Sequence, residues 1–212
     1  VEAMDNAVGR VLDEIEAQGL TEKTIIVFFS DNGGLSTAEG SPTSNLPLRA
    51  GKGWLYEGGI RVPMILSWKG TVPAGKEIHT PVISNDFLPT FLDLSGNRKT
   101  LESIPNLDGK SLKNWILAPE TAKDREALYW HYPHYGNQGG NPGSVIREGD
   151  WKLIYCYETQ KVELYNLKED IGEQNNLAEV QPELAEKMKT NLFDWLVSTK
   201  AAFPRPNEAQ EK

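Results

Sequence analysis

The sequence is poor in the residues that build disulfide frameworks and zinc sites. Among its 212 residues it has one cysteine, Cys156, and three histidines. A single cysteine excludes an internal disulfide and any zinc site made of several cysteines. Cys156 stands in an apolar stretch with no basic neighbour, which predicts a packed, unreactive thiol in a strand.

The sequence also lacks an excess of positive charge and any long apolar run. It has 22 lysines and arginines against 30 aspartates and glutamates, a net charge of −8 at pH 7. Without a basic face we predict no nucleic-acid partner. No apolar run approaches the roughly 20 residues that cross a bilayer, so we predict no membrane span. An anionic substrate would have to be held by local positive charge, from a metal or a lysine.

The first half of the chain has the pattern of an α/β fold. Apolar residues at helical spacing predict an amphipathic helix that ends near Gly19: Val1, Met4, Val8, Val11, Leu12 and Ile15. The unbroken apolar run at 24–30 then predicts a strand covered on both faces. A helix followed by a buried strand is typical of α/β proteins. Further on, the sequence predicts a strand at 62–68, a helix from Asn85 to Leu94 capped by Asn85 or Asp86, and a short helix at 109–117.

The second half has a different pattern. Three strands that suit an antiparallel sheet are predicted at 127–132, 151–157 and 161–166. A closing helix is predicted from apolar positions on one face: Leu184, Met188, Leu192, Trp195 and Leu196. Because Pro119 separates the two patterns, we predict one domain at 1–118 and a small α+β subdomain at 119–212.

Two oxygen-bearing side chains, Asp31 and Asn32, directly follow the first predicted strand. Ligand sites of open α/β sheets gather at the carboxyl ends of strands. A carboxylate beside an amide oxygen suits Ca²⁺ or Mg²⁺ and suits zinc poorly. The motif by itself favours an ordinary turn, because Asp, Asn and Gly all tolerate turn geometry.

A lysine surrounded by glycines, Lys52, lies about twenty residues later. The glycines allow the backbone to approach a ligand closely. The segment is not a Walker-type phosphate loop, since Gly53 stands where Ser or Thr is required. A solvated lysine on a flexible loop is the alternative. Arg49 is a second candidate substrate ligand, and Arg61 suits a structural ion pair with Glu57.

The order and spacing of these motifs resemble those in the distal half of the type I sulfatases. These enzymes are the formylglycine-dependent members of the alkaline phosphatase superfamily. The resemblance rests on the Asp-Asn-Gly triplet at 31–33 and the Gly-Lys-Gly…Tyr-Glu-Gly-Gly-x-Arg-x-Pro segment at 51–63, and continues through 84–94, 149–154 and 163–167. It implies the C-terminal part of an alkaline-phosphatase-like mixed-sheet sandwich plus a small antiparallel sheet with a packed C-terminal helix. It also implies that Asp31 and Asn32 ligate calcium, with magnesium possible, and that Lys52 contacts the sulfate ester or its leaving oxygen.

The nucleophile of that family is missing from the sequence. The family uses a Cys or Ser in a C/S-x-P-x-R motif, which is oxidised to formylglycine. Tyr157 and Glu158 follow Cys156, and the proline after Ser44 comes one residue too late. We therefore expect the distal part of a sulfatase, inactive alone, whose upstream part supplies the nucleophile and the other calcium carboxylates. The resemblance further implies a sulfated small molecule or glycan as substrate, and a periplasmic or extracellular location.

An aromatic and imidazole-rich stretch, which includes His131 and His134, precedes a Gly- and Asn-rich loop at 136–141. Pro133 between the histidines argues against a helical two-histidine metal site. Either histidine could contact the sulfated substrate at the mouth of the site, or the stretch could be a structured loop without that role.

Two rival functions stay open at this point. One is a phosphatase or phosphonate-ester hydrolase of the same superfamily, although the zinc-dependent members need several histidine ligands. The other is a non-catalytic carbohydrate-binding module.

Overall fold

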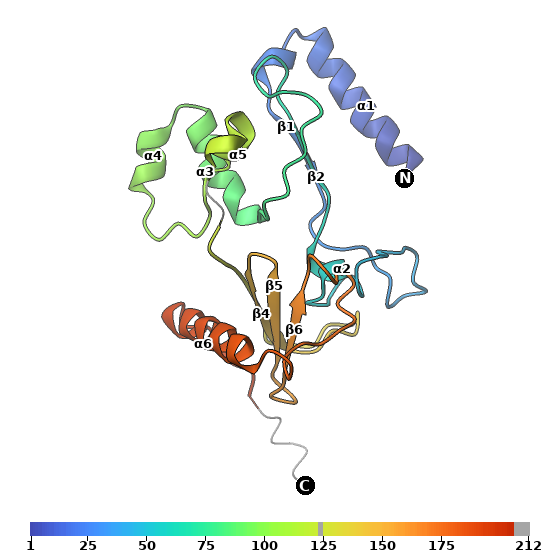
Figure 1. The fold of residues 1–212 in the computed structure, drawn as a ribbon. Coiled ribbons are helices and arrows are strands. Elements are labelled where there is room, and N and C mark those ends of the chain that lie inside the picture. The colour runs from blue at the N-terminus through green and yellow to red at the C-terminus, as the bar shows by residue number, and fades with distance from the viewer. Residues whose placement is uncertain (123–124, 206–212) are drawn as a thin grey trace. The chain divides into compact units, whose positions relative to one another are not determined.

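The computed structural model describes residues 1–122 and 125–205, which form parts of two compact units (Figure 1). The first unit comprises Val1–Phe28 and Met64–Asp124, and the second comprises Phe29–Pro63 and Arg125–Lys212. Residues 29–63 thus belong to the same compact unit as the C-terminal part of the chain. The sequence-based domain boundary after residue 118 stays a prediction.

The first unit is mostly helical. Its helices are α1 (Glu2–Ala17), α3 (Phe87–Leu94), α4 (Arg98–Ser103) and α5 (Lys113–Leu117), with short 3₁₀ turns at Thr21–Lys23, Ser84–Asp86 and Pro119–Thr121. Its strands β1 (Ile26–Phe29) and β2 (Met64–Ser67) pair in a two-stranded sheet. Helices α1, α3 and α5 and strands β1 and β2 were predicted to within a few residues. The 3₁₀ turns and α4 were not predicted, and α4 lacks a clear apolar periodicity.

The predicted burial of β1 is wrong. Phe28 and Phe29 are 39% and 42% exposed, and α1 has no buried residue. Within the described part of the chain, β2 is the sheet partner of β1. Residues of α5 pack against Met64 and Leu66 of β2, whereas α1 buries none of its residues. An apolar run of this length indicates residues that are suited to burial. Whether they are buried depends on other segments that pack against them.

Asp86 joins two segments of the first unit. It was predicted to cap α3, but its carboxylate instead accepts hydrogen bonds from the backbone amides of Ile83 (2.9 Å) and Lys110 (2.8 Å). The hydroxyl of Thr90 accepts a further hydrogen bond from the backbone amide of Leu112 (2.8 Å). These bonds fix the start of α3 against the segment that leads into α5.

The second unit is built around a four-stranded antiparallel sheet. Its strands are β3 (Leu128–Tyr132), β4 (Gly143–Glu148), β5 (Trp151–Cys156) and β6 (Val162–Asn166), paired in the order β3-β4-β5-β6. The other elements are the single-turn helix α2 (Glu57–Ile60) and the long helix α6 (Pro182–Ser198). Strand β4 was not predicted, because its two apolar residues stand between glycine and charged positions.

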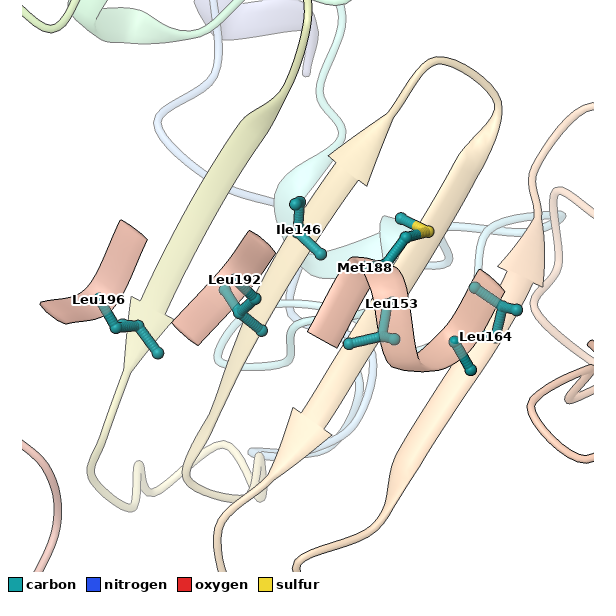
Figure 2. Close-up of a cluster of buried hydrophobic side chains, with 7 residues drawn as sticks. Ile146, Leu153, Leu164, Met188, Leu192 and Leu196 are labelled. Atoms are coloured by element: carbon teal, nitrogen blue, oxygen red, sulfur yellow. The ribbon is translucent and has the colours of Figure 1, made fainter. Parts of the chain in front are cut away.

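The sheet is covered on both faces. Helix α6 packs on one face, where the side chains from the two elements interdigitate in Figure 2 and all are fully buried: Ile146, Leu153, Leu164, Met188, Leu192 and Leu196. Leu55 and Tyr56 pack on the opposite face, against Val145, Ile154 and Tyr165. The glycine-rich segment that carries Lys52 is therefore attached directly to the sheet.

Candidate functional site

Asp31 and Asn32 lie just beyond the carboxyl end of β1, as their place in the sequence predicted. The amide nitrogen of Asn32 donates a hydrogen bond to Oδ2 of Asp31 at 2.6 Å, and the hydroxyl of Ser30 donates to the carbonyl of Asn32 at 2.8 Å. Because Asn32 uses its nitrogen in this bond, its oxygen and the Asp31 carboxylate can point to a common cation. Their roles as metal ligands stay predictions.

These two oxygen donors do not complete a cation site. Calcium takes six to eight oxygen ligands. Within residues 1–122 and 125–205, no group of three or more His, Cys, Asp or Glu side chains could hold a metal ion. The donor chemistry fits a hard cation, and the number of donors requires further ligands from elsewhere.

The segment that carries Lys52 is hydrogen-bonded to the chain that follows Asn32. The amide of Lys52 donates to the carbonyl of Gly34 at 3.1 Å, and the amide of Gly33 donates to the carbonyl of Gly59 at 2.9 Å. The side chain of Lys52 is exposed. The structure therefore joins the Lys52 segment to the two residues that directly follow Asn32, and it leaves the Lys52 side chain exposed.

Close backbone contact explains why glycines stand in this assembly. A Cβ atom on Gly33 would lie 1.7 Å from the carbonyl oxygen of Gly58, and one on Gly59 would lie 2.0 Å from that of Trp54. No side chain fits at either position without displacing backbone. The glycines therefore allow the Lys52 segment and the Asp31 segment to pack against each other.

Asn45, which the sequence did not single out, fastens the same assembly. Its amide nitrogen donates to the carbonyls of Gly34 (2.8 Å) and Ala50 (3.0 Å), and its oxygen accepts from the amide of Gly34 (3.1 Å). The side-chain amide of the partly buried Asn45 thus supplies hydrogen bonds to backbone groups that an irregular loop would otherwise leave without partners.

Arg49 is engaged inside the second unit. Its Nη1 atom donates to the hydroxyl of Tyr165 at 3.0 Å and to the carbonyl of Glu173 at 2.7 Å, and its guanidinium lies 3.8 Å from the centre of the Tyr56 ring. These contacts give Arg49 a part in holding the loop. Its predicted contact with substrate is not tested by them.

A carboxylate connects the two tyrosines beside Arg49. The hydroxyls of Tyr56 and Tyr165 both donate to Oε2 of Glu163, at 2.9 and 2.8 Å. Burial and the Glu163 carboxylate raise the pKa of both tyrosines well above the usual range. Both hydroxyls therefore stay protonated at neutral pH and remain hydrogen-bond donors.

A fully buried ion cluster lies at the start of α2. Lys152 Nζ is 2.9 Å from Oε1 of Glu57 and 2.8 Å from Oε1 of Glu173, and none of the three residues is more than 1% exposed. Arg147 and Arg61 approach the other oxygen of Glu57 at 3.7 and 3.8 Å. The predicted Arg61–Glu57 pair is present, but it is longer than the bond to Lys152.

Sequence reasoning missed Lys152 and Glu173. One signal was available for Lys152, because alternation along β5 puts its side chain on the same face as the apolar Ile154. A charge on a buried face needs a partner of opposite sign. No local pattern identifies Glu173 as that partner, because it lies more than twenty residues away in a loop.

His131 holds the end of the chain to the sheet. Its Nδ1 lies 2.7 Å from the hydroxyl of Ser144, and its Nε2 lies 2.9 Å from the carbonyl oxygen of Ala202. Since a carbonyl can only accept, Nε2 is the donor in this second contact. His134 is exposed, with its ring against Tyr132. The predicted substrate contacts of both histidines stay predictions.

The loop at 136–141 reaches the Lys52 segment through residues other than histidine. The indole nitrogen of Trp54 donates to the carbonyl of Gln138 at 3.1 Å and to the hydroxyl of Thr37 at 3.1 Å. A Cβ atom on Gly140 would lie 1.8 Å from the carbonyl oxygen of Gly53. The loop therefore packs against the residues next to Lys52.

A pocket of about 300 Å³ opens beside this contact. Trp54 and Tyr56 stack with their ring centres 6.0 Å apart on one side of it. Strands β5 and β6 and the loops at their ends complete the lining, which includes the polar side chains of Asn141, Lys161 and Glu163. An aromatic wall with amide and charged groups around it can hold a polar ring compound.

Two family models match the chain. The model described as N-sulphoglucosamine sulphohydrolase, C-terminal, matches residues 50–200, and the model described as Sulfatase matches residues 1–97. The two matches overlap over the segment that carries Lys52. Together they cover nearly all of the residues that the structure describes.

Individual relatives agree with the family models. A sulfatase of Formosa agariphila is 37% identical over 95% of this chain and 39% of its own length. An N-acetylglucosamine-6-O-sulfatase of Bacteroides thetaiotaomicron is 33% identical over 99% of this chain and 36% of its own length. The chain thus spans less than half the length of the curated relatives it matches.

Solved structures agree as well. The structure of BT4656 in complex with its substrate, D-glucosamine-2-N,6-O-disulfate, superposes with a TM-score of 0.73 at 27% identity, over 100% of this chain and 41% of that one. This likeness confirms the predicted fold class, an α/β chain with a small antiparallel sheet and a packed C-terminal helix.

Proposed function

The chain belongs to the sulfatases of the alkaline phosphatase superfamily, and we propose that it is the C-terminal part of a longer sulfatase, called the complete enzyme below. The reaction proposed for the complete enzyme is hydrolysis of a sulfate ester. The observation that carries the proposal is the backbone hydrogen bonding between the Lys52 segment and Gly33 and Gly34, the two residues that follow Asp31 and Asn32.

Asp31 and Asn32 are proposed to ligate Ca²⁺, or Mg²⁺ in its place. Their oxygen donors suit such a hard cation, and the remaining ligands are assigned to the part of the complete enzyme outside these residues. The chemistry that such a cation supplies is stabilisation of negative charge on the sulfuryl oxygens. The bond from Asn32 Nδ2 to Asp31 sets the relative orientation of the two donors.

Lys52 is proposed to place its ammonium group against the sulfate ester or its leaving oxygen. Its backbone is fixed by the bond to Gly34, while its side chain is exposed and able to reach a substrate. A positive charge at the leaving oxygen stabilises the charge that develops as the ester bond breaks. The nucleophile, a formylglycine, is assigned to the upstream part of the complete enzyme, since covalent catalysis requires an activated nucleophile.

A sulfated sugar is the proposed substrate. Relatives act on an N-acetylglucosamine-6-O-sulfate or bind a glucosamine disulfate, according to their names. In this chain, the pocket walled by Trp54 and Tyr56 offers aromatic rings and polar groups suited to a sugar ring. We also propose a periplasmic or extracellular location. No described helix has both the length and the apolar character needed to cross a membrane.

The test is steady-state kinetics of the complete enzyme with aryl sulfates and aryl phosphates. Replacing Lys52 with alanine should lower kcat/KM for the sulfate by ~10²-fold or more, because a charge aimed at the transition state is lost. Lys168→Ala, which removes another exposed lysine of the second unit, is the matched control and should leave kcat/KM unchanged. An unchanged kcat/KM in Lys52→Ala would refute the catalytic role.

Two further measurements complete this test. Asp31→Ala should weaken calcium binding as well as turnover, measured by calcium titration. The 212 residues alone should hydrolyse no sulfate ester. Faster turnover of the phosphate than the sulfate would instead support the phosphatase alternative, and calcium-independent glycan binding unaffected by Asp31→Ala or Lys52→Ala would support a binding module.

A further inference from the structure

One residue outside the motif, Glu173, contacts both ends of the segment that carries Lys52. Its Oε2 atom accepts a hydrogen bond from the backbone amide of Glu57 at 2.7 Å. Its carbonyl oxygen accepts one from Nη1 of Arg49, also at 2.7 Å. Arg49 precedes Lys52 by three residues and Glu57 follows it by five. The segment between them is therefore anchored at its two ends on the same residue.

The anchored segment is also closed on itself. The amide of Gly58 donates to the carbonyl of Arg49 at 2.9 Å, and the amide of Trp54 donates to that of Gly51 at 3.0 Å. A segment of this kind has few ways to move as long as its ends are held. Removing the carboxylate of Glu173 would release the Glu57 end directly, while the Arg49 end depends on the position of the Glu173 carbonyl.

Glu173 is itself held firmly in place. It adopts a left-handed backbone conformation with φ of 52°, which is costly for a residue other than glycine. The carboxylate of Asp170 accepts hydrogen bonds from the next two amides, those of Gln174 (2.8 Å) and Asn175 (2.7 Å). This arrangement presents the carbonyl and the carboxylate of Glu173 to the Lys52 segment together.

Lys152 offsets the energetic cost of burying the Glu173 carboxylate. Its Nζ atom lies between the carboxylates of Glu57 and Glu173, at 2.9 and 2.8 Å. Burial raises the pKa of Glu173, and the Lys152 ammonium opposes that rise. Two carboxylates enclosed together would repel each other without this cation. Lys152 is fully buried on the inner strand β5, so the cluster ties the Lys52 segment to the interior of the sheet.

We propose that Glu173, supported by Lys152, is a positioning residue that holds Lys52 in place for sulfate-ester cleavage. The proposal rests on the catalytic role of Lys52 given above. Glu173 touches no reacting atom in this scheme and acts only by fixing the backbone that carries the ammonium. Small displacements of a catalytic group can cost ~10²-fold in rate, so a loss of this anchor should be measurable.

The first experiment measures hydrogen exchange by mass spectrometry in the complete enzyme. In Glu173→Ala, peptides that cover 49–59 should exchange at least ~10-fold faster, because the local opening of the segment becomes easier. Peptides from β4 and β5 should keep their rates. Glu179→Ala, which removes an exposed carboxylate a few residues away, is the matched control. Unchanged exchange over 49–59 would overturn the proposal.

The second experiment is a double-mutant cycle on kcat/KM for sulfate esters. Glu173→Ala should lower kcat/KM by ~10-fold in the parent enzyme and by no further factor in the Lys52→Ala background, because the anchor acts only through Lys52. The loss should be larger for sugar sulfates than for 4-nitrophenyl sulfate, whose leaving group needs less charge stabilisation. A purely structural role would lower all of these rates by the same factor.

Each result has a distinct meaning. If Glu173→Ala does not fold, Glu173→Gln serves in its place, since its side-chain oxygen can still accept from the Glu57 amide, and it should retain part of the activity. Equal losses in both backgrounds would overturn the positioning role. A Lys52→Ala variant with full activity would refute the proposed function of Lys52, while the exchange rates would still decide whether Glu173 anchors the segment.

Discussion

The two units differ in how completely each buries its own apolar residues. In the second unit, six large apolar side chains from the sheet and α6 are entirely buried. In the first unit, the buried cluster consists of Leu112, Trp115 and Ile116, while apolar residues of α1 and β1 remain exposed. The Lys52 segment is attached to the unit with the complete core. A catalytic group that must be held precisely in space benefits from such a support.

Of the substitutions that compare the two units, the one that disrupts the buried ion cluster should cause the largest loss of unfolding free energy. Lys152→Met leaves Glu173 buried without its cation and leaves Glu57 with only the longer contacts to Arg147 and Arg61. This change should destabilise the second unit by about 3 to 5 kcal/mol. Urea unfolding of the 212-residue chain, followed by hydrogen exchange in β5, measures this loss. Lys161→Met, at an exposed site, is the control. A loss below about 1 kcal/mol would mean that the cluster contributes little to the stability of the second unit.

A matched pair of leucines tests the comparison directly. Leu192 in α6 is fully buried, whereas Leu12 in α1 is 41% exposed. Leu192→Ala should cost about 2 to 5 kcal/mol, because it leaves a cavity in a close-packed core. Leu12→Ala should stay within about 0.5 kcal/mol in this chain. Similar losses in the two variants, measured by urea unfolding, would show that the units do not differ as described.

The smallest expected effect is a difference in pH dependence. Burial alone would raise the pKa of Asp93 in the first unit, but hydrogen bonds from Ser111 and Lys113 outweigh it and lower this pKa below its ordinary value of 3.8. Since the folded-state pKa is depressed, the stabilisation is present above the ordinary value and is lost as pH falls through the folded-state pKa. Glu173 in the second unit has the opposite shift, so its contribution falls as pH rises above the ordinary value of 4.5.

This difference can be measured by unfolding each unit between pH 3 and pH 6. Asp93→Asn should remove less than about 1 kcal/mol from the first unit at pH 6 and almost nothing at the lowest pH, since its partner Lys113 is partly exposed. A loss that grows as pH falls would contradict the assigned sign. Ser95→Ala, near the end of the same helix, provides a control without a titrating group.

Most elements of the fold were predictable because their periodicity is local. The spacing of apolar residues located α1 and α6, capping residues located α3, and strand-like runs located β5 and β6, all to within a few positions. Strand β4 was missed because its signal is only two apolar residues long, and α2 was missed because two of its four residues are glycines. The burial of β1 was overestimated because burial depends on surfaces that lie elsewhere.

The candidate site was predictable only in part, for a related reason. Asp31, Asn32 and Lys52 stand in short motifs that can be read from neighbouring residues. The residues that hold them, such as Asn45, Lys152 and Glu173, are identified by contacts between segments far apart in the sequence. Family resemblance pointed to the groups proposed for the chemistry, while the geometry revealed what supports them.

The hydrogen bond between His131 and the carbonyl of Ala202 sets a limit on how far the chain can be shortened for crystallisation or spectroscopy. Phe203 next to it meets the rings of His131, Tyr157 and Phe193. A chain that stops at Lys200 loses the acceptor for Nε2 and uncovers three aromatic rings, so it should be less soluble. A chain that stops at Arg205 keeps both contacts, and trimming should therefore end there.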